Sequence, residues 1–289
     1  MNRVSVVIAT LGGESLFSTI DKLNSGTLIP GEILVCIPSS EYKHSTFLFE
    51  DDNIKVIPTP IRGQVAQRAY GFRRAQYEYV LQLDDDMFVD QYCLQRLVDA
   101  IEIHGTTASV SPALINEQTG RSVYEKPKGP KFLWNIYFWL MNGSKGYQPG
   151  TIDMAGSAIG VGPAFVVSRF VEVEWLAGGC ILHRRNNLII KDFWERPGKA
   201  YFEDVLHSYL LRQRNIRLFI DTSARCELEV VWKKRMTFRD FLVDSYRDFS
   251  ARKYYMKRVS KVSLRIYFYY IVRFSSYIWG SLSSRRLGF

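Results

Sequence analysis

The feature that most constrains the fold is a regular alternation of short apolar runs with segments of helical periodicity. The runs are rich in β-branched residues and bounded by turn residues, which is typical of buried strands. The predicted strands are 3–9, 32–37, 54–57, 79–83, 108–111, 171–175 and 217–220. The predicted helices are 14–23, 64–76, 91–103 and 203–214. This order predicts an α/β fold, with a mostly parallel sheet flanked by helices and a C-terminal helical extension.

Three predicted strands are followed directly by residues that could contact a ligand. Thr10, Pro38 and Asp84 each stand at the carboxyl end of one of these strands. In parallel α/β sheets, ligands bind beyond the carboxyl ends of the strands. The sequence therefore predicts a single binding rim to which all three segments contribute.

The positive charge of the chain is concentrated at its C-terminus. The net charge is +9 over 289 residues, but no Asp or Glu follows Asp248, and nine Lys and Arg do. The remainder carries 29 basic and 29 acidic residues and is formally neutral. A uniformly basic nucleic-acid-binding domain is therefore excluded. Four sparse cysteines and an N-terminus without a signal-peptide pattern favour a cytoplasmic protein with reduced thiols.

An acidic triplet, Asp84-Asp85-Asp86, stands at the end of the fourth predicted strand. Three adjacent carboxylates repel one another and need cations or hydrogen-bond donors nearby. A hard divalent ion such as Mg²⁺ or Mn²⁺ suits them, because it takes oxygen ligands and can be completed by phosphate oxygens. The alternative is a solvated acidic turn that favours the dipole of the next helix. The position at the rim favours the metal site.

Two further groups carry candidate chemistry. Glu203 and Asp204 fall in the first turn of a predicted helix, where they either compensate its dipole or provide a general base for an attacking hydroxyl. Gly178-Gly179 either lets the backbone approach a ligand closely or forms a tight turn before the apolar run 180–182. Taken alone, neither group decides between its two interpretations.

Four stretches, taken together, resemble the inverting family 2 glycosyltransferases of GT-A fold, and within them the non-processive, rhamnosyltransferase-like members. They are the opening strand 4–10, the segment Gly63–Gly71, the sequence Leu83–Asp86, and Trp175–Arg185 followed by Phe193 and 201–204. Each motif is short, but their shared order and spacing over residues 3–220 are specific.

The resemblance implies an enzyme that transfers one hexosyl or deoxyhexosyl unit, with inversion, from a UDP- or dTDP-sugar to a glycan or lipid-linked acceptor. The implied process is cell-surface polysaccharide biosynthesis, such as that of lipopolysaccharide. Residues 1–115 would form the nucleotide-sugar half and 116–248 the acceptor half of one domain, followed by the tail 249–289. The segment 116–165 could be a lid or an acceptor-side insertion.

The resemblance also implies roles for individual residues. Asp204 would be the catalytic base, supported by Glu203, and Asp84 and Asp86 would hold Mn²⁺ or Mg²⁺. The implied nucleotide-sugar-binding residues are Thr10, Arg68, Asp84, Asp85, Trp175, Gly178 and Gly179. Many family members carry a histidine that reaches the metal after the next strand, and 224–229 contains none, so the remaining protein ligand stays open.

The tail 252–289 combines nine basic residues with ten aromatic ones and no acid. Only seven uncharged residues separate Arg265 from Arg273, too few to cross a bilayer. As a helix, the tail would place Tyr267, Ile271 and Phe274 on one face, which suits a helix lying on an anionic membrane surface. The chain is therefore predicted to be peripheral at the inner face of the cell membrane. The alternative is a helical pair packed on the catalytic domain.

Two other functions remain open. A nucleotidyltransferase could use a similar sheet and metal triplet, but it would want a basic, glycine-rich phosphate loop, for which 10–13 is a poor candidate. A non-catalytic membrane-surface binding protein would act through the tail alone. It predicts that Asp204→Asn is harmless.

Overall fold

The computed structural model describes residues 3–42, 51–125, 130–163, 166–194, 200–229, 236–260 and 263–286. The chain folds as two compact units, each built from two segments. Unit 1 comprises residues 1–125 and 161–232, and unit 2 comprises 126–160 and 233–289. The boundary expected at residue 248 from the charge pattern falls inside a helix of unit 2. Over the described ranges, every helix is too short or too polar to span a bilayer.

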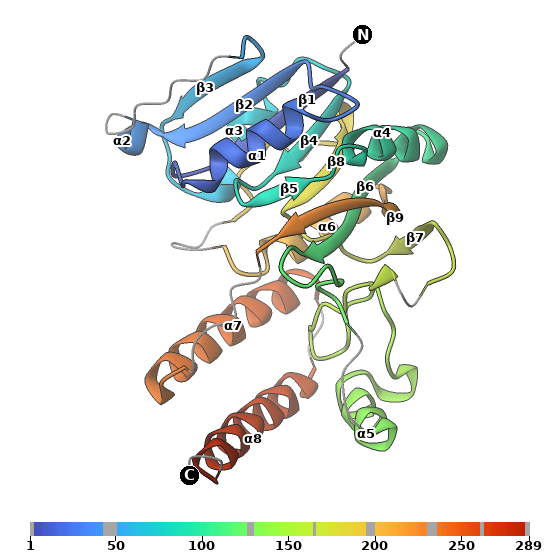
Figure 1. The fold of residues 1–289 in the computed structure, drawn as a ribbon. Coiled ribbons are helices and arrows are strands. Elements are labelled where there is room, and N and C mark those ends of the chain that lie inside the picture. Colours follow the sequence, from blue (N-terminus) through green and yellow to red (C-terminus); the bar gives the residue numbers. More distant parts are fainter. Residues whose placement is uncertain are drawn as a thin grey trace. The chain divides into compact units, whose positions relative to one another are not determined.

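Unit 1 is built around a nine-stranded sheet with the order β3-β2-β1-β4-β8-β6-β9-β5, in which β7 also pairs with β9 (Figure 1). The strands are β1 (Val4–Ala9), β2 (Glu32–Pro38), β3 (Ile54–Thr59), β4 (Tyr79–Leu83), β5 (Met87–Val89), β6 (Ala108–Asn116), β7 (Phe170–Val173), β8 (Cys180–Arg184) and β9 (Arg217–Leu228). The predicted α/β class is confirmed.

Parallel pairing joins the first four strands of the order, and the C-terminal half of the sheet is mixed. Strand β8 runs antiparallel between β4 and β6, with Cys180 opposite Leu83. The start of β8 therefore lies beside the end of β4. This reversal brings Gly178-Gly179 to the acidic triplet, although about ninety residues separate them in sequence.

Helices cover both faces of the sheet. The helices of unit 1 are α1 (Ser15–Asn24), α2 (Ser39–Tyr42), α3 (Gln64–Phe72), α4 (Cys93–His104) and α6 (Glu203–Gln213), with a short 3₁₀ turn at Arg185–Asn187. α1 and α4 pack with Val6 and Ile8 in one buried cluster, whereas α3 packs with Val7 in another. The alternation of side chains along β1 thus separates the two layers of core.

Two predicted strands prove longer than expected, and one proline is tolerated. β6 continues to Asn116 and β9 to Leu228, past Ser111 and Ile220, at which the predicted strands ended. Pro58 was expected to end the third strand but lies within β3. β3 is the edge of the sheet, where a residue without an N–H group need not break a ladder of hydrogen bonds.

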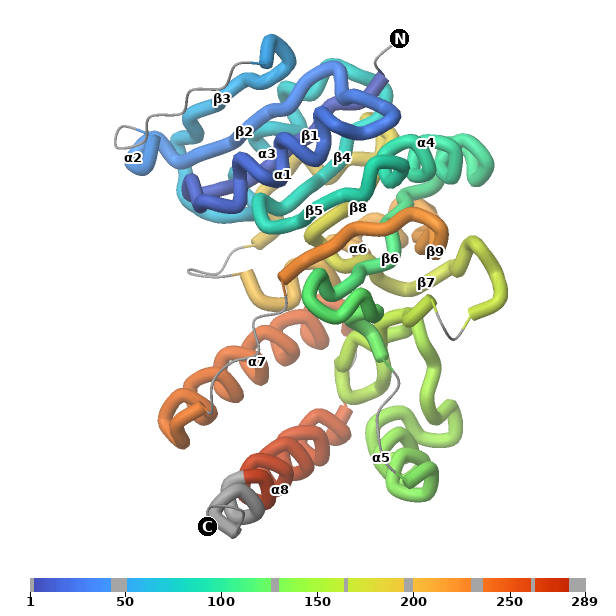
Figure 2. Tube along the Cα trace, in the orientation of Figure 1, coloured from blue at the N-terminus to red at the C-terminus, as the bar shows by residue number. Residues whose placement is uncertain are grey.

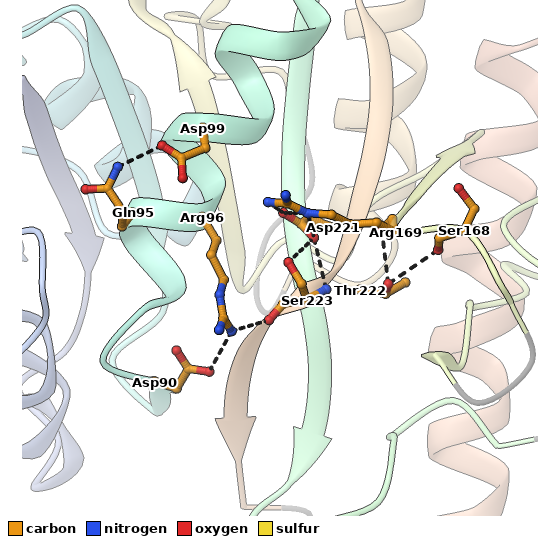
Figure 3. Close-up of polar contacts among 9 residues, drawn as sticks. All are labelled: Asp90, Gln95, Arg96, Asp99, Ser168, Arg169, Asp221, Thr222 and Ser223. Atoms are coloured by element: carbon orange, nitrogen blue, oxygen red, sulfur yellow. Dashed lines mark hydrogen bonds and ion pairs between the residues drawn. The ribbon is translucent and has the colours of Figure 1, made fainter.

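A bulge divides β9 into two parts with different neighbours. The register of β9 against β6 shifts after Asp221 and resumes at Arg225. Asp221 is fully buried and holds the bulge: it accepts hydrogen bonds from the Ser223 backbone N–H at 2.9 Å and the Ser223 hydroxyl at 2.7 Å, and it pairs with Arg169 at 2.9 Å (Figure 3). The first part of β9 pairs with β7 and the second with β5, the strand that follows the triplet.

The helices of the described part of unit 2 are α5 (Lys131–Asn142), a 3₁₀ turn (Gly143–Lys145), α7 (Phe238–Arg258) and α8 (Arg265–Arg286). α7 and α8 lie side by side (Figures 1 and 2). The ring of Tyr277 on α8 stacks on Phe241 of α7 with 4.1 Å between centroids. Arg273 pairs with Asp244 at 2.7 Å. The predicted C-terminal helical extension is confirmed.

Candidate active site

The acidic triplet forms the turn between β4 and β5. The Asp84 backbone N–H donates to the carbonyl of Gly179 at 2.9 Å, which ties the triplet to the start of β8. The hydroxyl of Thr10, directly after β1, donates to the Asp85 carboxylate. Because β1 and β4 are parallel neighbours, their carboxyl ends meet, and Thr10 and the triplet lie on one rim as predicted.

Arg68, on helix α3, connects the acidic triplet to the acidic pair. Arg68 is almost fully buried, at 3% exposure, and its guanidinium contacts two carboxylates. Its Nη2 lies 2.5 Å from Asp84 Oδ1, and its Nη1 lies 2.5 Å from Glu203 Oε1. Burial acts to lower the pKa of Arg68, but the two carboxylates more than offset it and raise that pKa, so the guanidinium stays charged.

The acidic pair stands at the start of α6. Phe202, the residue before the helix, adopts a left-handed conformation with φ 65°, which is rare for a bulky side chain and marks a constrained turn. Glu203 is buried against Arg68, whereas Asp204 is half-buried and accepts a hydrogen bond from the Val205 N–H at 2.8 Å.

Both carboxyl groups at the start of α6 have a raised pKa. Burial raises the pKa of Glu203, against the opposing effect of Arg68. Burial, and after it the neighbouring charge of Glu203, raise the pKa of Asp204 to about 7. A carboxylate with a pKa near the working pH is suited to remove a proton from a hydroxyl.

Gly178 and Gly179 allow other segments of the protein to pack closely against the backbone before β8. A Cβ at Gly178 would lie 2.8 Å from Glu203 Oε1 and 3.3 Å from Asp204 Cβ, so only glycine lets α6 come this near. A Cβ at Gly179 would lie 3.1 Å from the Met87 side chain. The predicted close approach thus involves the acidic pair and β5, and contact of these glycines with a sugar stays a prediction.

Trp175 reaches this region indirectly. Its side chain is buried and meets the Tyr124 ring edge-on, with 5.9 Å between centroids. Tyr124 is in turn close enough to Asp204 for the carboxylate to act on it: burial first, and then Asp204, raise the pKa of Tyr124. Direct contact of Trp175 with a donor sugar also stays a prediction.

The carboxylates of the triplet are suited to a hard divalent ion whose other ligands are oxygens of a diphosphate. Asp84 Oδ1 takes hydrogen bonds from Arg68 and from Gln64 Nε2, at 3.0 Å, whereas Oδ2 has no hydrogen-bond partner among the described residues. Asp86 is exposed. Across the described ranges, no three side chains of His, Cys, Asp or Glu gather as a metal-binding group. Two carboxylates with phosphate and water oxygens would complete the octahedral shell that Mg²⁺ or Mn²⁺ takes.

Four residues of the site were not singled out from the sequence. Gln67 donates to the carbonyls of Thr10 and Cys36, at 2.9 and 2.8 Å, Gln64 reaches Asp84, Gln82 donates to the Gly178 carbonyl, and Tyr124 approaches Asp204. The glutamines could have been noticed because they lie on elements whose other residues are mostly apolar. Gln82 interrupts the apolar run of β4, and Gln67 is buried on α3. The prediction used only the apolar periodicity.

Comparison with known proteins shows a similarity to one family over the central part of this site. Residues 38–161 match the profile described as Glycosyl transferase family 2. This region is similar to glycosyl transferase family 2. The family 2 region contains Arg68 and the triplet, and Glu203 and Asp204 lie beyond it. No curated protein matches the chain.

Solved structures extend the likeness to nearly the whole chain. The crystal structure of GalNAc-T7 with UDP, GalNAc and Mn²⁺ matches with a TM-score of 0.54 and 18% sequence identity, over 91% of this chain and 56% of that one. The chain thus spans a little over half the length of that protein. It is one of 295 matching chains, so the fold assignment does not depend on a single neighbour. The predicted GT-A fold is confirmed, and the rhamnosyltransferase-like detail stays a prediction.

Proposed function

We propose that this chain is a metal-dependent inverting glycosyltransferase that moves one hexosyl or deoxyhexosyl unit from a nucleotide sugar to an acceptor hydroxyl. One observation carries the proposal: a single buried guanidinium, that of Arg68, contacts both Asp84 of the triplet and Glu203 of the acidic pair. The carboxylates suited to a leaving diphosphate and those suited to an attacking hydroxyl therefore belong to one site.

The triplet would serve the donor. A divalent cation at Asp84 and Asp86, when bound, would neutralise charge on the leaving diphosphate. Asp85 and Thr10, already hydrogen-bonded to each other, would border the nucleotide. The structural neighbour GalNAc-T7 holds UDP and Mn²⁺, which supports a UDP-sugar and Mn²⁺ over the dTDP-sugar and Mg²⁺ that the sequence left equally open.

The acidic pair would serve the acceptor. Asp204 is the less buried of the two, and its pKa of about 7 lets it exist as a carboxylate and still accept a proton. It would take the proton from the attacking hydroxyl as the C–O bond to the anomeric carbon forms and the bond to the diphosphate breaks. Glu203, fixed by Arg68, would hold the first turn of α6 in place. A single displacement of this kind inverts the anomeric configuration.

The acceptor is proposed to be a glycan or a lipid-linked saccharide in cell-surface polysaccharide synthesis, such as that of lipopolysaccharide. The enzyme would work as a peripheral protein at the inner face of the cell membrane, with its tail on the anionic lipid. The exposed apolar side chains of α8, among them Tyr267 and Ile271, support this location.

Turnover of nucleotide sugars tests the proposal. Purified chain would be incubated with UDP- and dTDP-sugars, with Mn²⁺, Mg²⁺ or EDTA, and with lipid-linked and free saccharide acceptors, and release of the nucleoside diphosphate would be followed. Asp204→Asn should abolish release but retain donor binding by thermal shift, and Asp21→Asn, at an exposed aspartate of unit 1, should leave it unchanged. The anomeric configuration of the product, read by NMR, should be opposite to that of the donor.

Four outcomes would contradict the proposal. Absence of stabilisation by every nucleotide sugar with either metal would exclude the donor class. Release of pyrophosphate from a nucleoside triphosphate and a sugar phosphate would make the chain a nucleotidyltransferase. Full activity of Asp204→Asn would remove the proposed base, and vesicle binding with no turnover in any condition would favour the non-catalytic alternative.

A further inference from the structure

The two units carry opposite charge. Unit 2 has eighteen Lys and Arg against four Asp, a net charge of +14, whereas unit 1 has twenty against twenty-five acids, a net charge of −5. The excess positive charge thus belongs to the whole helical unit and extends beyond its C-terminal tail. A surface of this sign is attracted to polyanions and to anionic lipid.

Two segments of unit 2 that are far apart in sequence share an unusual composition. Residues 126–152 contain four Lys, six aromatic residues and no Asp or Glu. Residues 249–289 likewise combine basic and aromatic residues without an acid. The first segment contains α5 and the second contains α8, so both helices come from acid-free stretches of chain.

Helix α8 turns several polar and aromatic side chains toward α7 and leaves other large apolar side chains exposed. Arg273, Tyr270 and Tyr277 face α7, where Tyr270 donates to Asp248 at 2.6 Å and Tyr277 to the Met236 carbonyl. Large apolar side chains elsewhere on α8 are exposed: Tyr267, Phe268, Ile271, Ile278 and Trp279. Ile271 is 60% exposed and Trp279 is 76% exposed. A helix of a soluble protein ordinarily has the reverse arrangement.

Helix α5 shows the same arrangement in shorter form. Phe132, Ile136 and Trp139 follow one another at intervals of four and three residues, so they lie on one face of the helix. All three are exposed, Phe132 at 71% and Trp139 at 59%. Phe138 and Met141, on the other side, are buried within the unit.

The two helices are joined by Arg265, the first residue of α8. Its guanidinium donates to the carbonyls of Trp139 and Leu140, at 2.8 and 2.5 Å, at the end of α5. Trp139 is therefore itself one of the two residues through which α8 holds α5. The exposed apolar faces of α5 and α8 belong to one folded body with fixed spacing.

We propose that α5 and α8 form a two-part membrane-docking surface, in which the aromatic stripe of α5 (Phe132, Ile136 and Trp139) enters the interface of an anionic bilayer beside α8. The combination of Trp, Tyr and Phe with Lys and Arg and without acids is suited to the boundary between headgroups and acyl chains. A protein partner would have to match this large positive charge as well. The inference rests on the membrane location given in the proposed function. It adds α5 to the membrane-contacting surface, and α5 lies in the family-matched segment 38–161.

Vesicle flotation of the full chain tests the proposal. Vesicles of phosphatidylcholine alone and with phosphatidylglycerol would be compared, without donor, metal or acceptor. Wild type should bind the anionic vesicles, and this binding should weaken with added salt, because exposed charges are screened. The variant F132S/I136S/W139S should lose roughly tenfold or more in partitioning, since each buried apolar group contributes to interfacial binding. The control F17S/I103S/I190S removes three exposed apolar side chains from unit 1 and should bind as wild type.

A label at Ile136 reports insertion directly. The four native cysteines are all buried, so I136C can be coupled to an environment-sensitive fluorophore, with I103C as control. A blue shift at position 136 but not at 103 on addition of anionic vesicles is expected. Unchanged flotation of the α5 variant, or a label at 136 that stays in water while the chain binds vesicles, would overturn the α5 contact and leave α8 alone.

Two further outcomes distinguish membrane docking from dimer formation and from glycosyltransferase activity. A wild-type chain that binds no vesicle, but forms dimers that the α5 variant abolishes in analytical ultracentrifugation, would show that the face holds a second copy and would overturn the lipid proposal. Because flotation requires no turnover, it can succeed when every glycosyltransferase assay fails, and the reverse holds as well.

Discussion

Asp204→Asn should make the protein more stable, by an amount that grows with pH. Burial and Glu203 raise the pKa of Asp204 from 3.8 to about 7 in the folded state. The folded protein therefore binds a proton more tightly than the unfolded chain does. Stability from this group is fully present below the unfolded pKa and is lost as the pH rises through the folded pKa. An asparagine, which does not ionise, avoids this loss.

The magnitude follows from the shift and from the exposure of the residue. A shift of about three units corresponds to about 4 kcal/mol, at about 1.4 kcal/mol per unit. Because Asp204 is only half-buried, solvent screening reduces this value, and we expect a gain of about 2 kcal/mol above the folded pKa. The asparagine Oδ1 can keep the hydrogen bond from the Val205 N–H, so no capping contact is lost.

Urea denaturation of both proteins at a series of pH values measures the effect. The free energies of unfolding should agree closely below about pH 4 and diverge between about pH 4 and 7, the window set by the unfolded and folded pKa values. Asp21→Asn, at an exposed site, is the control and should show no comparable divergence. A difference between wild type and Asp204→Asn that is constant across the window, or a variant that is less stable at neutral pH, would show that folding does not raise the pKa of Asp204.

Three further substitutions test the contacts around the site. Arg68→Gln leaves Glu203 buried without a counter-charge and should cost about 3–5 kcal/mol by urea denaturation, whereas the exposed Arg74→Gln should cost little; equal costs would contradict the role of the pair. Gly178→Ala places a Cβ 2.8 Å from Glu203 Oε1 and should cost about 1–3 kcal/mol, whereas Gly280→Ala, in open space on α8, should be neutral or slightly stabilising. Asp221→Asn keeps an acceptor but loses the ion pair to Arg169, and a fall of about 1–3 kcal/mol is expected in the same assay.

The sequence predicted those parts of the fold that depend on local pattern. β1, β2 and β4 are mostly apolar runs, and each was placed within one residue. The position of the triplet at the end of β4 then followed from the alternation of strands and helices. Thr10 could be placed on the same rim for the same reason, since parallel strands end on the same side of a sheet.

Contacts between distant segments could not be read in this way. The need for glycine at 178 comes from the first turn of α6, twenty-five residues further along, and from a strand whose antiparallel direction no local pattern reveals. Arg68 was expected to lie against the nucleotide, a role that stays a prediction, and nothing in its own helix indicates that its guanidinium joins Asp84 to Glu203.

The sequence left open which helix faces of unit 2 are covered. Helix α5 and helix α8 each have an amphipathic pattern, and such a pattern shows which side chains share a face but not whether that face is covered. On α8 the inward face carries Arg273 and Tyr270, because Asp244 and Asp248 of α7 offer them partners. The apolar face is left outward, and only the packed structure reveals this.

The assembly of unit 2 from two distant segments has a consequence for the growing chain. Arg265, which fastens α8 to the end of α5, is synthesised 126 residues after Trp139. At roughly 5–20 residues per second, this delay is about 6–25 seconds, far longer than a helix needs to form. During that time β7, β8 and β9 are still being made, and the aromatic helix α5 emerges from the ribosome without its partner. A nascent chain could therefore reach the lipid surface through α5 before its sheet is complete.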